Sequence, residues 1–187
     1  MANTQRDVLD AALAILDEFG LADLSMRRLA TALDIRPSAL YWHYPNKQTL
    51  LAAVADEVLA AVAAPNPAMR WDIQLHDTTV AMRAAMLRYK DSAEVISSAY
   101  ASGLITSPAG DYLVAAAQSG GMPAAAAEAA RTALSQFVIG FTIEQQTREQ
   151  MERLKVTAPS DRNFDAEFHA ALDLIVTGVR SLSPQLV

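Results

Sequence analysis

Apolar residues recur every three or four positions along most of the chain, which is the spacing of an amphipathic α-helix. Near the N-terminus this spacing predicts three short helices, which begin after Thr4, after Ser25 and near Arg36. Thr4 and Ser25 carry side chains that cap helix N-termini. Gly20 is typical of a helix end, and Pro37 is tolerated at a first helical position. No stretch alternates between apolar and polar residues as a strand would, so we predict an all-α protein.

The second helix and the third, at about 36–44, are joined by a tight turn at Asp34 and Ile35, which predicts a helix-turn-helix. A fourth amphipathic helix is predicted at 47–63, and the proline-rich segment after it is the clearest linker in the chain. We therefore assign residues 1–48 to a helix-turn-helix domain, 47–63 to a linking helix and 64–187 to a second domain. Helical patterns in the second domain cover residues 71–88, 93–100, 109–118, 123–155 and 164–182.

The last two predicted helices each carry an apolar band at helical spacing. The first band consists of Leu134, Phe137, Val138, Phe141 and Ile143, and the second of Phe164, Phe168, Leu172, Ile175, Val176 and Val179. A helix pair of this kind is suited to packing against a second pair in a four-helix bundle. We therefore predict a homodimer that forms through the two C-terminal helices.

Composition and charge agree with a helical, globular chain. The apolar fraction of 52% is ample for a buried core, and alanine, the best helix former, is abundant while aromatic residues are few. The net charge is -6, but residues 24–47 carry Arg27, Arg28, Arg36 and Lys47 against Asp34 alone, a local charge of +3. A small basic patch on an otherwise acidic protein can bind phosphates locally, so the negative net charge does not exclude nucleic acid as a partner.

Several classes of function lack the residues they need. There are no cysteines, so disulfides and thiolate metal sites are excluded. The most apolar region, 112–127, is interrupted by Gly120, Gly121 and Pro123, and no basic-then-apolar leader opens the chain. Asp165 and His169 lie four residues apart, but no Glu-x-x-His spacing, nucleophile-base pair or glycine-rich phosphate loop accompanies them. We expect a cytoplasmic protein that is not an enzyme, has no metal or other cofactor and does not bind membranes.

The stretch from Ser25 to Lys47 resembles the DNA-binding domain of the tetracycline-repressor (TetR) family of transcriptional regulators, and the similarity extends from Thr4 to Leu51. The string Leu40-Tyr41-Trp42-His43-Tyr44-Pro45-Asn46-Lys47 is closest to the tetracycline-repressor branch of that family. By this resemblance Arg27, Arg36, Pro37, Ser38 and Ala39 face the major groove, and Tyr41, His43 and Lys47 clamp phosphates. Arg28 and Trp42 complete the set of candidate DNA-binding residues.

Some of these residues have a second interpretation. The ring of Trp42 either contacts DNA or is a core residue that wedges the recognition helix against the first and fourth helices. Arg28 is also explained as a solvated charge, and His43 by itself as a satisfied polar group. The tetracycline repressors carry threonine and glutamine where this chain has Met26 and Pro37. We therefore expect an operator sequence different from theirs.

A weaker resemblance to the family's ligand-binding and dimerisation domain covers residues 83–91 and 137–146. Ile96 occupies the position of the metal-binding histidine of that branch, and Thr78 and Met82 the positions of two drug contacts. A magnesium-tetracycline inducer is therefore not expected. The candidate lining of an apolar effector site is Trp71, Met82, Met86, Tyr89, Tyr100, Met122 and Phe137, although apolar residues at helical spacing are otherwise core.

Together these patterns predict a ligand-responsive regulator, most simply a repressor, that binds a pseudo-palindromic double-stranded DNA operator as a homodimer. A small and largely apolar effector would release it from the DNA. The alternative is an acidic helical protein-interaction module without DNA binding, which leaves the basic and aromatic stretch from Arg36 to Lys47 unexplained.

Overall fold

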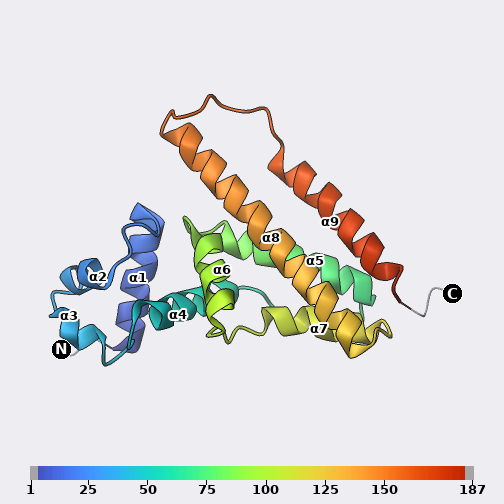
Figure 1. The fold of residues 1–187 in the computed structure, drawn as a ribbon, viewed down its shortest axis with the longest axis horizontal. Helices are drawn as coiled ribbons and strands as arrows, with labels where there is room; N and C mark the ends of the chain where they lie inside the picture. Colours follow the sequence, from blue (N-terminus) through green and yellow to red (C-terminus); the bar gives the residue numbers. More distant parts are fainter. Residues whose placement is uncertain (1–3, 184–187) are drawn as a thin grey trace. The chain divides into compact units, whose positions relative to one another are not determined.

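The computed structural model describes residues 4–183, and every regular element in that range is an α-helix, as predicted (Figure 1). The helices are α1 (Gln5–Phe19), α2 (Met26–Ala32), α3 (Pro37–Leu40), α4 (Lys47–Leu59), α5 (Trp71–Met86), α6 (Ser92–Ser102), α7 (Ala109–Ser119), α8 (Ala124–Arg153) and α9 (Phe164–Arg180). None of them, within residues 4–183, combines the length and hydropathy needed to cross a lipid bilayer.

The predicted helix starts are confirmed by their caps. Thr4 Oγ1 accepts the amide N–H of Asp7 at 3.2 Å, and the Asp7 carboxylate accepts the amide of Thr4 at 2.7 Å, which forms a capping box. These bonds from Thr4 lower the pKa of Asp7. Ser25 Oγ accepts the amide of Arg28 at 3.1 Å, and Asn46 Oδ1 that of Thr49 at 2.9 Å.

The third helix is shorter than predicted. It ends at Leu40, and the chain then continues through a tight turn in which the amides of His43 and Tyr44 both donate to the Leu40 carbonyl at 2.9 Å. Pro45 follows immediately, and a proline disfavours helical geometry in the residue before it. The fourth helix likewise ends at Leu59, short of residue 63.

The chain forms two compact units that do not follow its sequence order. The first contains the chain as far as Ala60 together with Met86–Ser107, so that α6 packs against α4. Its core contains fully buried side chains from every one of its helices, including Val8, Leu16, Leu29, Leu40, Leu50, Val54 and Ile96. The second unit contains Ala61–Ala85 and the chain from Pro108 onward.

In the second unit α8 packs against both α7 and α9, and α8 and α9 run side by side (Figure 1). Leu134, Phe168 and Leu172 are fully buried. The rings of Phe137 and Phe141 lie 5.2 and 5.4 Å from the ring of Phe168. The apolar bands predicted to pack on a second helix pair are therefore largely occupied within one chain, because α8 and α9 turn those faces toward each other and toward the core.

Candidate DNA-binding surface and effector domain

A helix-turn-helix is built from α2, α3 and the turn between them. Asp34 takes a left-handed conformation, with φ of 53°, and the Ile35 amide donates to the Ala30 carbonyl at 3.0 Å. The side chains of Leu29 and Leu40 are fully buried, which holds the two helices against each other through their inner faces. The outer faces are left for solvent or a partner.

The predicted DNA-binding residues lie on α2, α3 and the segment that follows α3 as far as Lys47. Arg27, Arg36, Pro37, Ser38, Tyr41 and Trp42 are exposed, and Arg28, Ala39, His43 and Lys47 are partly exposed. Trp42 is 90% exposed and Tyr41 50%. The interpretation of Trp42 as a core residue is therefore wrong, since its ring lies in solvent.

Three of the cations on this surface carry charges that no carboxylate within the described residues neutralises. Within residues 4–183, Arg27, Arg36 and Lys47 take part in no ion pair. Arg28 differs, because its guanidinium pairs with Asp23 and lies 3.8 Å above the ring of Phe19. Arg28 thus makes local contacts that join α2 to the end of α1.

Tyr44 is a residue whose role the sequence did not reveal. It is 4% exposed, whereas Tyr41 and Trp42 in the same aromatic run are on the surface. Burial raises the pKa of its hydroxyl, an effect that the neighbouring Gln5 amide and Arg6 guanidinium partly offset. Tyr44 therefore anchors, between α1 and α4, the end of the reading segment, by which we mean residues 36–47.

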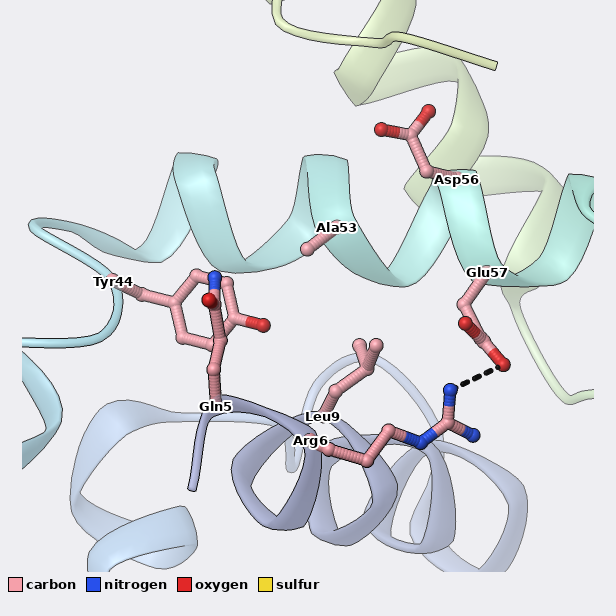
Figure 2. A pocket seen from close by; sticks show the side chains of 7 residues that line it. All are labelled: Gln5, Arg6, Leu9, Tyr44, Ala53, Asp56 and Glu57. Atoms are coloured by element: carbon pink, nitrogen blue, oxygen red, sulfur yellow. Dashed lines mark hydrogen bonds and ion pairs between the residues drawn. The ribbon is translucent and has the colours of Figure 1, made fainter. Parts of the chain in front are cut away.

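A shallow groove of about 390 Å³ separates α1 from α4 at this point (Figure 2). Figure 2 shows the Gln5 side chain lying next to the Tyr44 ring, and the guanidinium of Arg6 reaching across to Glu57. The Arg6–Glu57 distance is 2.9 Å, and Arg6 also pairs with Asp10 at 2.9 Å. This contact ties the N-terminal helix to the helix that follows the reading segment.

Asp56, on the same turn of α4, was also missed. Its carboxylate accepts the Thr106 amide at 2.9 Å, the Thr106 hydroxyl at 2.6 Å and the Ser107 amide at 2.7 Å. It thereby fixes the segment after α6 to α4. An aspartate in the middle of an amphipathic helix gives no sign of a partner fifty residues away, so the sequence carried no signal for it.

The candidate effector residues fall in both units. In the second unit Met82 and Met122 are buried, the Trp71 ring packs against the backbone of Gly120, and Phe137 stacks on Phe168. In the first unit Met86 is buried, and Tyr89 and Tyr100 are partly exposed. Ile96 is fully buried on α6, so an apolar side chain lies at this position. Within the described part of the chain, no three histidine, aspartate or glutamate side chains are grouped to hold a metal ion.

Comparison with known families identifies the chain. Residues 8–54 match the family described as bacterial regulatory proteins, tetR family, and residues 64–162 match the tetracyclin repressor-like C-terminal domain. The protein is a member of the TetR family. TetR proteins are DNA-binding transcriptional regulators and not enzymes, as the sequence predicted.

The TetR chain is similar to curated tetracycline repressors. It is 30% identical to the class C repressor of Escherichia coli over 97% of this chain and 93% of that protein. It is 41% identical to the class D repressor of Escherichia coli over 99 residues, which are 51% of this chain and span less than half, 45%, of that protein.

Solved structures resemble the chain over nearly its full length. BioQ of Mycobacterium smegmatis superimposes with a TM-score of 0.88 at 38% identity, covering 96% of this chain and 98% of that one. A BioQ structure with its natural double-stranded DNA operator gives 0.84 at 37% identity, covering 96% and 99%. TetR-Q116A from Acinetobacter baumannii in complex with minocycline gives 0.80 at 27% identity, covering 97% and 98%.

Proposed function

We propose that this TetR protein is a ligand-responsive repressor that binds a pseudo-palindromic operator as a homodimer and is released by a small, largely apolar effector. The observation that carries the proposal is the exposed surface around α3, where Arg27, Arg36 and Lys47 lack ion-pair partners within residues 4–183 and Tyr41 and Trp42 project into solvent. Unpaired cations bind phosphates, and exposed aromatic rings pack on sugars and thymine methyl groups.

Two relatives support the two halves of this function. BioQ has been solved with a double-stranded DNA operator, and its likeness extends over 96% of this chain. The Acinetobacter baumannii TetR variant has been solved with minocycline, a small molecule. We carry DNA binding and ligand binding over to this chain, but not the drug, because Ile96 offers no metal ligand where the tetracycline-repressor pattern has a histidine.

The proposed dimer uses the faces of α8 and α9 that the chain itself leaves uncovered. Leu174 is 76% exposed, and Gly140, in the middle of α8, and Gly178, in the last turn of α9, are exposed glycines with nothing within 4 Å of an added Cβ. Glycine at an exposed helical position costs about 1 kcal/mol relative to alanine, and it permits close approach of another backbone. The helix-turn-helix domains of the two subunits would then bind half-sites about 34 Å apart.

The deciding experiment measures binding of the purified protein to DNA from upstream of its own gene by electrophoretic shift. We expect a complex that weakens as salt rises, because protein binding releases counterions from the phosphates and this release is less favourable at high salt. Tyr41→Ala, Lys47→Ala and Arg36→Ala should weaken it without altering dimerisation. Arg153→Ala is the matched control, since Arg153 is exposed at the end of α8 and far along the chain from α3.

Normal operator binding by both Tyr41→Ala and Lys47→Ala would contradict the assignment of the reading surface. Absence of any salt-sensitive DNA complex would favour the alternative, an acidic interaction module, and would remove the repressor proposal altogether.

A further inference from the structure

A buried guanidinium lies at the meeting point of three helices in the second unit. Arg83 on α5 has a side chain only 7% exposed. One terminal nitrogen donates to Gln145 Oε1 on α8 at 2.7 Å, and Nε reaches the same oxygen at 3.3 Å. The other terminal nitrogen lies 2.8 Å from Asp165 Oδ1 on α9. A buried cation needs such compensation, because an unpaired charge in a low-dielectric interior is costly.

The carboxylate that compensates Arg83 comes from the surface. The Asp165 side chain is 79% exposed and belongs to the first turn of α9. Of the two partners, Gln145 is buried and carries no charge, so the full counter-charge is supplied by a side chain that solvent surrounds. If Asp165 turned away, this edge of the guanidinium would lose its counter-charge.

Aromatic rings lie beside the same guanidinium. The guanidinium carbon lies 4.6 Å from the centre of the Phe168 ring and 5.8 Å from that of Phe141. Phe164 meets Phe141 edge-on at 6.2 Å, and Phe137, Phe141 and Phe164 are each partly exposed. A carboxylate that reached Arg83 would thus place its carbon chain or ring beside apolar aromatic surface.

We propose that Arg83 is a recognition site for an organic carboxylate with an apolar body, and that Asp165 occupies this site as an internal stand-in when no ligand is bound. The inference rests on the proposed function and specifies its effector class as apolar but anionic. Replacing one carboxylate by another keeps the guanidinium paired with one negative charge. The ligand gains affinity from contact with the phenylalanine rings. Asp165 competes with it for Arg83 because the chain keeps the Asp165 carboxylate at a high local concentration there.

The exchange would also act on the regulator. Asp165 holds the first turn of α9 to α5, and α9 is one of the two helices that we assign to the dimer. Displacing Asp165 frees that turn from α5, which offers a route from ligand binding to dimer geometry and operator affinity.

The test is titration calorimetry of the full-length protein with octanoate and 4-phenylbutyrate, with octylammonium as a probe of opposite charge. We expect both carboxylates to bind and octylammonium not to bind. Asp165→Asn should bind them about tenfold more tightly if Asp165 occupies the site in about nine of ten molecules, because the variant removes the competitor. Asp173→Asn is the matched control, since Asp173 lies on the same helix, is 72% exposed and does not pair with Arg83.

Arg83→Gln should abolish carboxylate binding. Arg83→Lys should weaken it, because lysine keeps the positive charge but lacks the planar guanidinium that donates two parallel hydrogen bonds. If the Arg83–Asp165 ion pair only stabilises the fold, Asp165→Asn should lower the melting temperature and leave the carboxylate affinity at the wild-type value. That result, or no carboxylate binding by Asp165→Asn, would overturn the inference. If the protein binds operator DNA but no carboxylate, the carboxylate inference fails and the proposed function stands. If it binds octanoate but no DNA, the proposed function fails.

Discussion

The aromatic run before Pro45 contains neighbours with opposite roles. Trp42 is 90% exposed and Tyr44 is 4% exposed, although both are large aromatic residues in one short turn. Tyr44 packs between α1 and α4 and holds the segment in place. Trp42 contributes nothing to the core, so its ring is available for a partner.

Trp42→Ala should therefore separate binding from stability. We expect the free energy of unfolding to change by less than about 0.5 kcal/mol, because the side chain is in solvent. Operator affinity should fall about tenfold, which corresponds to about 1.4 kcal/mol. Urea unfolding and electrophoretic shift measure the two quantities. Leu154→Ala, at an apolar residue 67% exposed at the end of α8, is the control, and unchanged operator affinity of Trp42→Ala would contradict the assignment.

Gly20 is a residue that the local backbone requires. Its φ of 85° is left-handed, and an added Cβ would lie 2.5 Å from Asp91 Oδ2. That same oxygen accepts the Leu21 amide at 2.8 Å, so the carboxylate cannot move without losing a hydrogen bond. Gly20→Ala should lower the free energy of unfolding by about 1 to 3 kcal/mol.

Gly103→Ala is the matched control for this prediction. Gly103 also has a left-handed φ, 67°, but nothing lies within 4 Å of its added Cβ. The difference between the two variants in urea unfolding measures the clash with Asp91 together with the extra backbone strain at Gly20, whose ψ is 180° whereas that of Gly103 is 15°. Equal destabilisation by both variants would show that Asp91 moves aside freely.

At the scale of elements, Asp72 connects the first turn of α5 to α9. Its carboxylate binds Arg70, with Nε to Oδ1 at 3.0 Å, accepts the Ile73 amide at 3.1 Å and lies 3.4 Å from Arg180 Nε on α9. Burial alone would raise the pKa of Asp72, but Arg70, with Ile73 and Arg180, outweighs this effect and lowers the pKa below its ordinary value. The ionised form is thus favoured in the folded state.

The sign of the pH dependence follows. A carboxyl whose pKa is lowered by folding stabilises the fold above its unfolded pKa of about 3.9, and that stability is lost as the pH falls through the folded value. Asp72→Asn should be about 1 to 3 kcal/mol less stable than the wild type at pH 7, and the difference should shrink below about pH 4. Chemical unfolding across this range measures it. Asp161→Asn, at an exposed aspartate, removes the same charge as a control, and a gap that stays constant with pH would contradict the prediction.

At the scale of the whole molecule, the charge distribution favours the proposed homodimer over a single DNA-binding copy. The chain carries a net charge of -6, and residues 24–47 carry +3. A patch of this size neutralises few phosphates, so a single copy would bind DNA weakly and with a shallow salt dependence. Two copies held together double the contacts and make the second binding event intramolecular.

Leu174→Glu tests this dependence on dimerisation. Leu174 is 76% exposed on α9, so a charge there should leave the fold intact and oppose the apolar contact of the proposed interface. We expect a monomer in sedimentation velocity and operator affinity reduced at least about a hundredfold. Leu154→Glu, also at an exposed leucine, should remain dimeric and bind normally. A dimeric Leu174→Glu variant would place the interface elsewhere.

The sequence by itself determined the helical class, the helix starts and the helix-turn-helix. Caps such as Thr4, Ser25 and Asn46 act on amides three residues away, so their signals are local and can be read from the chain. Only the tertiary structure decided that Trp42 faces solvent and Tyr44 the core, and that Arg83 meets Gln145 and Asp165. Apolar periodicity marks a face for burial but not the surface that covers it, because that choice depends on contacts between residues far apart in the chain.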